Sequence, residues 1–142
     1  MKMKLLMVDD ERDFIGMLSQ RLETRGFEVT TALSGAEAVD LVREQEFDVV
    51  VLDVLMPGKD GISTLKEIKA LKPLIQVIML TGHATVGTAI QGMKQGAFDY
   101  LMKPTDVTDL VGKITEAYEV KSAQEERIRK AEIEGILKRK SW

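Results

Sequence analysis

Three aspartates, a threonine and a lysine stand at the ends of short apolar segments in this sequence. Asp9 and Asp10 follow "LLMV", Asp53 ends "FDVVVLD", Thr81 follows "LIQVIML", and Lys103 follows "AFDYLM". Three carboxylates that meet in a poorly solvated place repel one another unless a cation neutralises them, and Mg²⁺ with oxygen ligands does so directly. A lysine and a hydroxyl group can hold a phosphoryl group beside such an ion, and an aspartate can itself accept one. These residue types together predict phosphoryl transfer.

The five side chains can meet only if the segments that precede them are strands of one sheet. Five segments are short and rich in apolar or β-branched side chains, as buried strands are. They span residues 5–8, 27–32, 47–53, 74–80 and 97–102. The second ends in Thr-Ala without a reactive group, so the other four carry all the chemistry.

Segments with helical signals alternate with the predicted strands. The first predicted helix has apolar positions 14, 17, 18 and 22 and ends at Gly26, and the second begins with a capping box of Ser34 and Glu37. The third has apolar positions from 62 to 71 and ends before Pro73. The fourth spans about 85–95, and Thr105 or Asp106 caps the fifth. Glycine in a helix interior costs about 1 kcal/mol relative to alanine, so the helix with Gly87 and Gly92 should be the least rigid. Five alternating pairs predict an α/β fold with a doubly wound (βα)5 parallel sheet, whose ligands bind beyond the carboxyl ends of the strands.

Length and composition exclude several classes of protein. The 142 residues fit one domain, the chain has no cysteine, and its one histidine, His83, rules out a multi-histidine zinc site. No apolar stretch approaches the roughly 20 residues that a membrane span needs, and the first residues lack the apolar segment of a signal peptide. We therefore expect a soluble, cytoplasmic protein without membrane contact.

The net charge of −3 is unevenly spread along the chain. Residues 121–142 hold seven Lys or Arg against four Glu, so the acidic excess belongs to residues 1–120. An acidic body is a poor candidate for binding nucleic acid through its bulk charge. The mixed charges of the tail favour a solvated helix face, and we expect no direct contact with nucleic acid.

The motifs at the predicted strand ends, taken in order, resemble those of a known family. "VDDE", "VVLDVLMPGKDG", "MLTGHA" and "GAFDYLMKP" are similar to the receiver domain (CheY-like) of bacterial two-component response regulators, over residues 4 to about 120. The stretch "TGHATVGTAIQGMKQGAFDYLMKP" resembles most the receivers of enhancer-binding transcription activators of the nitrogen-regulation kind. This resemblance implies a flavodoxin-like five-stranded sheet of order 2-1-3-4-5.

The resemblance also implies roles for individual residues. Asp53 would accept a phosphoryl group from the phosphohistidine of a sensor histidine kinase. Asp10 and Asp53, with the backbone carbonyl of Leu55, would bind Mg²⁺ directly, and Asp9 would act mostly through a bound water. Lys103 would pair with the phosphoryl oxygens.

Two further implications concern the response to phosphorylation. Thr81 would hydrogen-bond the phosphoryl group, and Tyr100 would be the switch aromatic that turns inward when Thr81 moves. Pro104 would follow a cis peptide bond. The fourth helix, the fifth strand and the fifth helix would form the output face, and a homodimer could form through that face or through the C-terminal helix.

The end of the chain extends beyond a minimal receiver. We expect a receiver domain over residues 1–120 and a helical extension over 121–142. Positions at heptad steps from 110 to 131 read Leu, Ile, Ala, Lys, Gln, Ile, Ala, which is half a coiled-coil seam with a polar middle. The chain is either a fragment of a longer regulator or a single-domain protein whose long helix dimerises or docks, and a disordered tail is a further alternative.

Two other functions remain open from the sequence. One is a Mg²⁺-dependent phosphohydrolase with an aspartyl nucleophile, although such enzymes carry a second aspartate where this chain has Leu55. The other is a dimerising interaction module that never takes phosphate, which the set of Asp10, Asp53, Thr81 and Lys103 argues against. The preferred reading is not an enzyme beyond its own phosphorylation and dephosphorylation.

Overall fold

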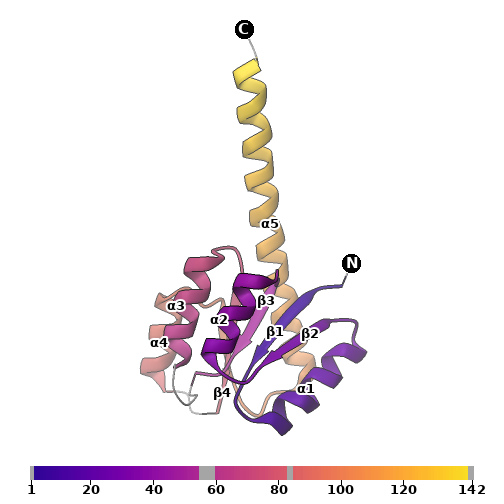
Figure 1. The fold of residues 1–142 in the computed structure, drawn as a ribbon, viewed down its shortest axis with the longest axis vertical. Coiled ribbons are helices and arrows are strands. Elements are labelled where there is room, and N and C mark those ends of the chain that lie inside the picture. The colour runs from indigo at the N-terminus through magenta and orange to yellow at the C-terminus, as the bar shows by residue number, and fades with distance from the viewer. Residues whose placement is uncertain (1, 55–59, 83–84, 141–142) are drawn as a thin grey trace.

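Strands and helices alternate along the whole chain in the computed structural model, which describes residues 2–54, 60–82 and 85–140. The elements are β1 (Lys4–Val8), α1 (Arg12–Thr24), β2 (Glu28–Ala32), α2 (Gly35–Glu44), β3 (Val49–Leu52), α3 (Gly61–Leu71), β4 (Gln76–Thr81), α4 (Val86–Lys94), β5 (Asp99–Met102) and α5 (Val107–Lys140). The five strands are parallel and lie in the order β2-β1-β3-β4-β5. The predicted doubly wound (βα)5 sheet of order 2-1-3-4-5, with a long C-terminal helix, is confirmed (Figure 1).

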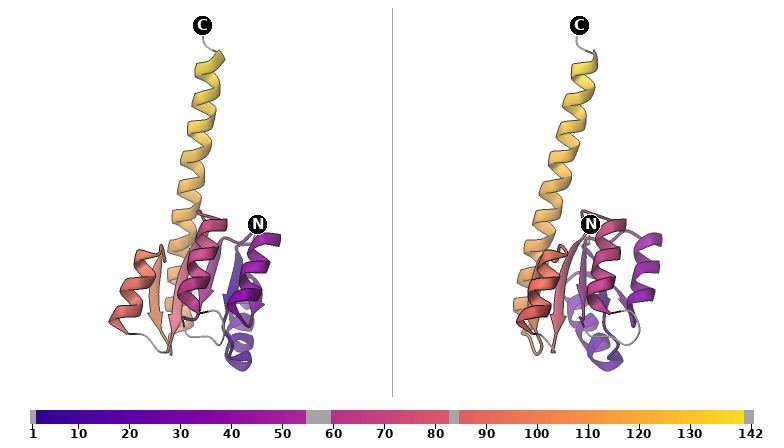
Figure 2. Two further views of the ribbon diagram at one scale, coloured as in Figure 1. Left: turned by 60° about the vertical axis from the view of Figure 1, so that its left-hand side comes forward. Right: turned by 90° about the vertical axis from the view of Figure 1, so that its left-hand side faces the viewer.

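Alternate residues of the central strands face two separate apolar cores. On β1, Leu6 and Val8 belong to the core under α2 and α3, whereas Leu5 and Met7 belong to the core under α1 and α5. The same alternation continues through β3 and β4. Because successive side chains of a strand point to opposite faces, the continuous apolar runs in the sequence are those of strands covered by helices on both sides (Figure 2).

Local signals start and end the helices largely as predicted. Ser34 Oγ accepts the N–H of Glu37 at 3.2 Å and so caps α2. The Glu37 carboxylate accepts the N–H of Leu33 at 3.1 Å, so the predicted capping box closes on the residue before the cap. Gly26 follows α1 with a φ of +93°, a conformation that glycine adopts without strain.

Helix α5 is 34 residues long, which corresponds to roughly 50 Å at 1.5 Å per residue. Its buried residues are Val107, Leu110, Ile114 and Ala117, all in its first part. The rest projects from the domain, as Figures 1 and 2 show. The extension is therefore helical as far as Lys140. The structure has a helix where the alternative would have a disordered tail.

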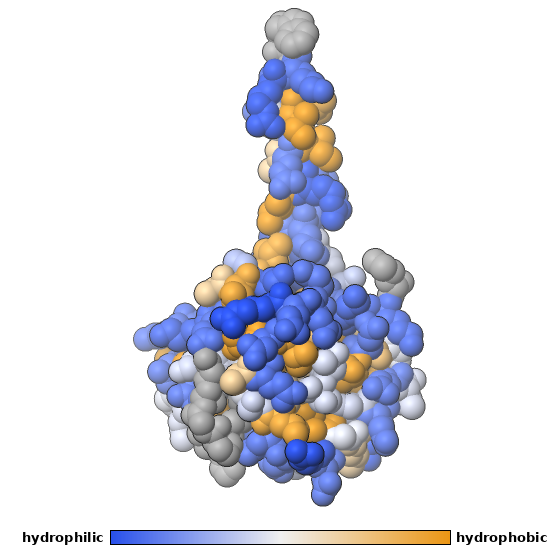
Figure 3. Space-filling model, viewed as in Figure 1, coloured by the Kyte–Doolittle hydropathy of each residue, from blue (hydrophilic) through white to orange (hydrophobic). Residues whose placement is uncertain are grey.

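The exposed part of α5 carries apolar residues among charged ones (Figure 3). Ile128, Ile133, Ile136 and Leu137 are exposed by 46% to 62%. Within the described ranges, no helix is both long enough and apolar enough to cross a membrane.

Candidate phosphoryl and metal site

The site lies where the carboxyl ends of four strands meet at one edge of the sheet. Asp9 follows β1, Asp53 follows β3, Thr81 is the last residue of β4, and Lys103 follows β5. Backbone hydrogen bonds set these ends side by side: the N–H of Asp53 donates to Val8 O at 3.0 Å, and that of Lys103 donates to Thr81 O at 3.0 Å. The sheet thus brings residues 94 positions apart in the chain to one place.

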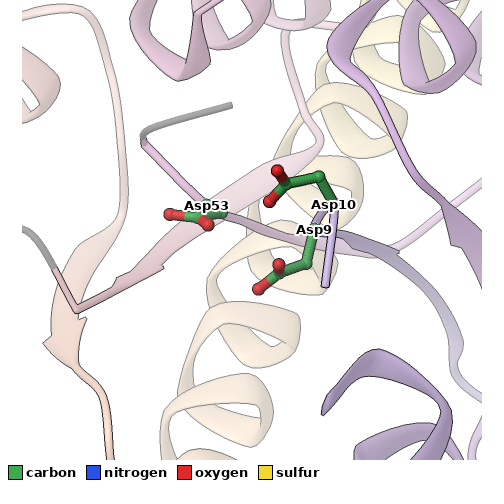
Figure 4. A group of neighbouring side chains, drawn as sticks. All are labelled: Asp9, Asp10 and Asp53. Carbon is green, nitrogen blue, oxygen red and sulfur yellow. The ribbon is translucent and has the colours of Figure 1, made fainter. Parts of the chain in front are cut away.

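Asp9, Asp10 and Asp53 form a compact acidic cluster (Figure 4). Each offers a carboxylate oxygen, and these oxygens all lie within 4.8 Å of one another. Asp9 and Asp53 are both 4% exposed, whereas Asp10 is exposed to solvent. Asp10 is not the cap of α1, because Glu11 occupies that position, and the Glu11 side chain makes no capping bond.

The donors of this cluster fit a hard divalent cation. All three are carboxylates, the ligands that Mg²⁺ and Ca²⁺ prefer, and two of them are removed from water where their repulsion is strong. Mg²⁺ binds few protein carboxylates and keeps places for water and phosphate oxygens. The backbone carbonyl of Leu55, the remaining predicted ligand, lies outside the described residues.

Lys103 contacts more acids than the sequence predicted. Its ammonium lies 2.6 Å from Asp9 Oδ2, 3.3 Å from Glu11 Oε1 and 3.6 Å from Asp53 Oδ2, and its side chain is 13% exposed. It also lies 4.3 Å from the centre of the Phe14 ring, within reach of a cation–π interaction. Glu11 and Phe14 are parts of the site that sequence reasoning missed.

Burial and charge shift the pKa values of the buried pair. Burial raises the pKa of Asp9, against the opposing effects of the Lys103 ammonium and the N–H of Glu11, which donates to Asp9 Oδ1 at 2.9 Å. Burial alone would lower the pKa of Lys103, but the hydrogen bond to Asp9 and the charges of Asp9 and Asp53 outweigh burial and raise it. Lys103 is therefore a fixed positive charge at neutral pH.

The two predicted switch residues lie on neighbouring strands. Thr81 is fully buried and pairs with Met102 across β4 and β5. Tyr100 pairs with Met79, is half-buried and packs against the core under α2 and α3, and β4 separates its strand from β3, which Asp53 follows. The Lys103–Pro104 peptide bond that leads away from the site is cis.

Comparisons with known proteins point to one family. A family model described as response regulator receiver domain matches residues 5–115. The chain is 45% identical over 113 residues to the transcriptional regulatory protein ZraR of Escherichia coli K12, covering 80% of this chain and 26% of ZraR. It is 38% identical over 110 residues to the DNA-binding transcriptional regulator NtrC of Klebsiella pneumoniae, covering 78% of this chain and 24% of NtrC.

A solved structure has the same fold. It is a response regulator protein from Burkholderia pseudomallei with a phosphorylated aspartic acid, a calcium ion and citrate. Its TM-score is 0.77 at 32% identity, and the match covers 87% of this chain and 73% of that one. The chain spans about a quarter of the length of the curated relatives that it matches.

Proposed function

This chain belongs to the response regulator receiver domain family, and from that premise we propose that it is a phospho-acceptor switch of a two-component system. The observation that carries the proposal is the position of Asp53. Its buried carboxylate lies in the cluster with Asp9 and Asp10, and Lys103 Nζ is 3.6 Å away. A buried acid close to other acids and to an ammonium group suits phosphoryl transfer, and this supports the proposal.

The reaction takes a phosphoryl group from the phosphohistidine of a sensor histidine kinase. A carboxylate oxygen of Asp53 attacks the phosphorus in line, and a P–O bond forms as the P–N bond breaks. The electron pair of the broken bond returns to the imidazole nitrogen of the kinase. Water can later attack the same phosphorus, which releases inorganic phosphate and restores the Asp53 carboxylate, so the chain changes only its own modification.

Each group of the site has a task in this reaction. Asp10 and Asp53, with the Leu55 carbonyl, would hold Mg²⁺, and Asp9 would act on it through water. When bound, the ion would supply positive charge that offsets the negative charge of the phosphoryl oxygens. Lys103, after the end of β5 at the same edge of the sheet, supplies a second positive charge, and Thr81 donates a hydrogen bond to a phosphoryl oxygen. The Burkholderia pseudomallei protein, which carries a phosphorylated aspartic acid and a calcium ion, supports this assignment.

The output is a change of conformation at the surface of α4, β5 and α5. Phosphorylation adds up to about two negative charges beside Thr81, and movement of Thr81 and Tyr100 then biases α4. Gly92 of α4 is buried against Met79 of β4, where an added methyl group would overlap the methionine side chain. Helix α4 therefore packs closely on β4, the strand that ends in Thr81, and the contact is made at Gly92.

The regulated process is transcription, by analogy with the curated relatives, and the effector would be another domain or a partner. The exposed part of α5 supports a dimer through the C-terminal helix. A hollow along one face of α5 is lined by Ile128, Ala131, Gly135 and Ile136, together with the charged residues Glu132 and Arg139. A largely apolar face of this kind fits the same face of a second copy. The α4-β5-α5 surface is the alternative dimer interface.

The test is to incubate the chain with Mg²⁺ and acetyl phosphate and to follow the mass of the intact protein. We expect one phosphoryl group per chain, lost in Asp53→Asn and retained in Asp40→Asn, which removes an exposed carboxylate from α2. Phosphorylation that survives in Asp53→Asn would refute the acceptor. Absence of any phosphorylation, with acetyl phosphate and with a phosphorylated histidine kinase, would favour the interaction module.

Turnover distinguishes the switch from a phosphohydrolase. A phosphohydrolase with an aspartyl nucleophile uses a second acid two residues on, and that position is Leu55 here. We expect slow release of phosphate limited by loss of the acyl phosphate, and no multiple turnover of a phosphate monoester such as p-nitrophenyl phosphate.

A further inference from the structure

Apolar packing holds α5 against the domain only as far as Ala117. The next apolar residues, Tyr118 and Val120, are already 36% and 37% exposed. A helix that has left its packing surface swings or frays unless other contacts hold it. The direction of the projecting part of α5 therefore depends on contacts made after Ala117.

Lys121 makes a contact of this kind. Its ammonium lies 3.2 Å from Asp48 Oδ1, and its side chain is only 12% exposed. The same ammonium lies 3.2 Å from Glu125 Oε2, one turn further along α5. Most surface ion pairs contribute little because water screens them and mobile side chains must be ordered. This pair is mostly shielded from water, so it is screened less.

Asp48 is held rigidly by the sheet. Its second carboxylate oxygen, Oδ2, accepts the N–H of Lys4 at 2.9 Å. Its own N–H donates to Lys4 O at 2.8 Å, and its carbonyl accepts the N–H of Gln76 at 3.4 Å. The residue before β3 is thus tied to the starts of β1 and β4. Lys121 is bound to a fixed point of the domain and not to a mobile surface acid.

A cavity lies between the helix and the domain at the same level. Its volume is about 210 Å³, and Phe47, Leu71 and Pro73 line it from the domain while Lys121 and Glu125 line it from α5. Because side chains do not fill this space, close apolar packing does not fix the helix here. Lys121, which lines this cavity, pairs instead with Asp48, the neighbour of Phe47 in the chain.

Electrostatics favours the charged form of Lys121. Burial alone would lower its pKa, but the hydrogen bond and charge of Asp48, with those of Glu125, outweigh burial and raise the pKa. The ammonium therefore stays charged at neutral pH. A charged, hydrogen-bonded contact to a fixed acceptor is directional, as a positioning contact must be.

We propose that Asp48 and Lys121 form an anchor that makes α5 a rigid part of the domain as far as Glu125 and fixes the direction in which the rest of the helix leaves it. Asp48 precedes β3 and Asp53 follows it, so the anchor lies at the opposite end of this strand from Asp53 and does not depend on phosphorylation. It places the end of the compact domain after Glu125, beyond the expected boundary at residue 120. Whatever follows the helix, or pairs with it, receives its orientation from this contact.

The test measures a distance between α5 and the domain that changes when the angle between them changes. The sequence has no cysteine, so spin labels can be attached at Glu44→Cys on α2 and Glu134→Cys on α5, both exposed positions. Labelled chains are diluted into unlabelled chains so that only distances within one chain are measured. We expect a narrow distance distribution that widens about twofold in Lys121→Gln and in Asp48→Asn, because the freed helix samples more directions.

Arg129→Gln is the matched control. This substitution removes an exposed ion pair within α5, in which Arg129 Nη1 lies 2.7 Å from Glu126 Oε2. It removes no contact with the domain, so the width of the distance distribution should stay unchanged. Helical content by circular dichroism is measured in parallel. An unchanged width in both anchor variants, an equal widening in Arg129→Gln, or a widening that follows loss of helix would each overturn the anchor.

Discussion

Lys103 Nζ lies 2.6 Å from Asp9 Oδ2 but 3.6 Å from Asp53 Oδ2. The lysine that follows β5 is therefore bound mainly to an acid of the candidate ion site and less closely to the proposed acceptor. A divalent cation and the Lys103 ammonium neutralise the same carboxylates, and two cations a few ångströms apart repel each other. We therefore expect the lysine and the ion to compete for these carboxylates.

Removal of this competitor should strengthen ion binding. We expect Lys103→Met to lower the Kd for Mg²⁺ by roughly tenfold, or about 1.4 kcal/mol, because the ion no longer faces the ammonium charge. The same variant should take phosphate from acetyl phosphate more slowly, because a charge that stabilises the transferring group is lost. Isothermal titration calorimetry measures the first effect and intact mass the second.

Lys113→Met is the control for a general charge effect. Lys113 also binds two carboxylates, Asp99 at 2.8 Å and Glu116 at 3.4 Å, but it lies on α5 away from the cluster. The Mg²⁺ affinity of the Lys113→Met variant should match that of the unaltered chain. Equal Mg²⁺ affinity in Lys103→Met and the unaltered chain would contradict the competition.

The acidic cluster should make the stability of the chain depend on Mg²⁺. An ion that binds only the folded state adds about 2.7 kcal/mol at a hundred times its Kd. We expect that increase in urea unfolding with Mg²⁺ relative to EDTA, and its loss in Asp10→Asn, which removes a ligand. Asp13→Asn, an exposed acid in the first turn of α1, should keep the full increase. A Mg²⁺ effect of the same size in both variants would place the ion elsewhere.

The sheet and the acidic cluster could be predicted because both depend on patterns that the sequence displays directly. Apolar runs of strand length give the strands, and parallel strands necessarily bring their carboxyl ends to one edge. The strand boundaries were less accurate. The apolar run 74–80 predicts a strand over those residues, whereas β4 in the structure is Gln76–Thr81. An apolar run indicates burial, and Ile75 is buried although it is not part of the strand.

Side-chain partners could not be predicted in the same way. That Lys103 rests on Asp9, Glu11 and Phe14 depends on the turn after β5 and on rotamers, neither of which has a sequence period. Lys121 appeared in the sequence only as a polar break in a heptad seam. In the structure it faces Asp48, 73 residues earlier in the chain, and only the packed fold reveals that pairing.

The Asp99–Lys113 pair should make stability depend on pH in acid. Burial opposes ionisation of Asp99, but the Lys113 ammonium and the N–H of Tyr100 outweigh burial and lower its pKa. Because the folded pKa lies below the unfolded one, the unfolded chain binds more protons in this range. The contribution is therefore complete above about pH 5 and is lost as pH falls through the lowered folded pKa.

Urea unfolding at a series of pH values below about 5 tests the Asp99 assignment. Asp99→Asn should flatten the fall in unfolding free energy relative to the unaltered chain, whereas Asp40→Asn should leave its slope unchanged. The difference between variants removes contributions from the acidic cluster, which is common to all of them. Parallel curves for Asp99→Asn and the unaltered chain would show that this pair contributes nothing.

Ser19 and Thr64 are buried hydroxyl groups that should respond differently to removal. Ser19 Oγ in α1 has no hydrogen-bond partner among the residues that the structure describes, whereas Thr64 Oγ1 donates to Asp60 O at 2.9 Å. We expect Ser19→Ala to be neutral or to stabilise by up to about 1 kcal/mol, and Thr64→Val to destabilise by about 1 kcal/mol. Urea unfolding decides, and a loss of stability in Ser19→Ala would reveal a partner for that hydroxyl.

Gly61, the first residue of α3, packs closely against the backbone of Asp53, the proposed phosphoryl acceptor. A Cβ at this position would lie 2.5 Å from the carbonyl oxygen of Asp53 and 2.5 Å from the Cα of Val54, and both are backbone atoms that cannot turn aside. We therefore expect Gly61→Ala to destabilise the chain by about 1–3 kcal/mol. It should also slow phosphorylation, because the backbone of the acceptor must shift.

Gly16→Ala separates this effect from a general cost of replacing glycine. A Cβ at Gly16 of α1 meets nothing within 4 Å, so alanine there should stabilise by about 0.5–1 kcal/mol through helix propensity and leave phosphorylation unchanged. Unfolding in urea and the rate of mass gain with acetyl phosphate are measured for both variants. If Gly61→Ala were destabilised but phosphorylated at the normal rate, the acceptor would tolerate the shift, and the close contact between α3 and Asp53 would serve stability alone.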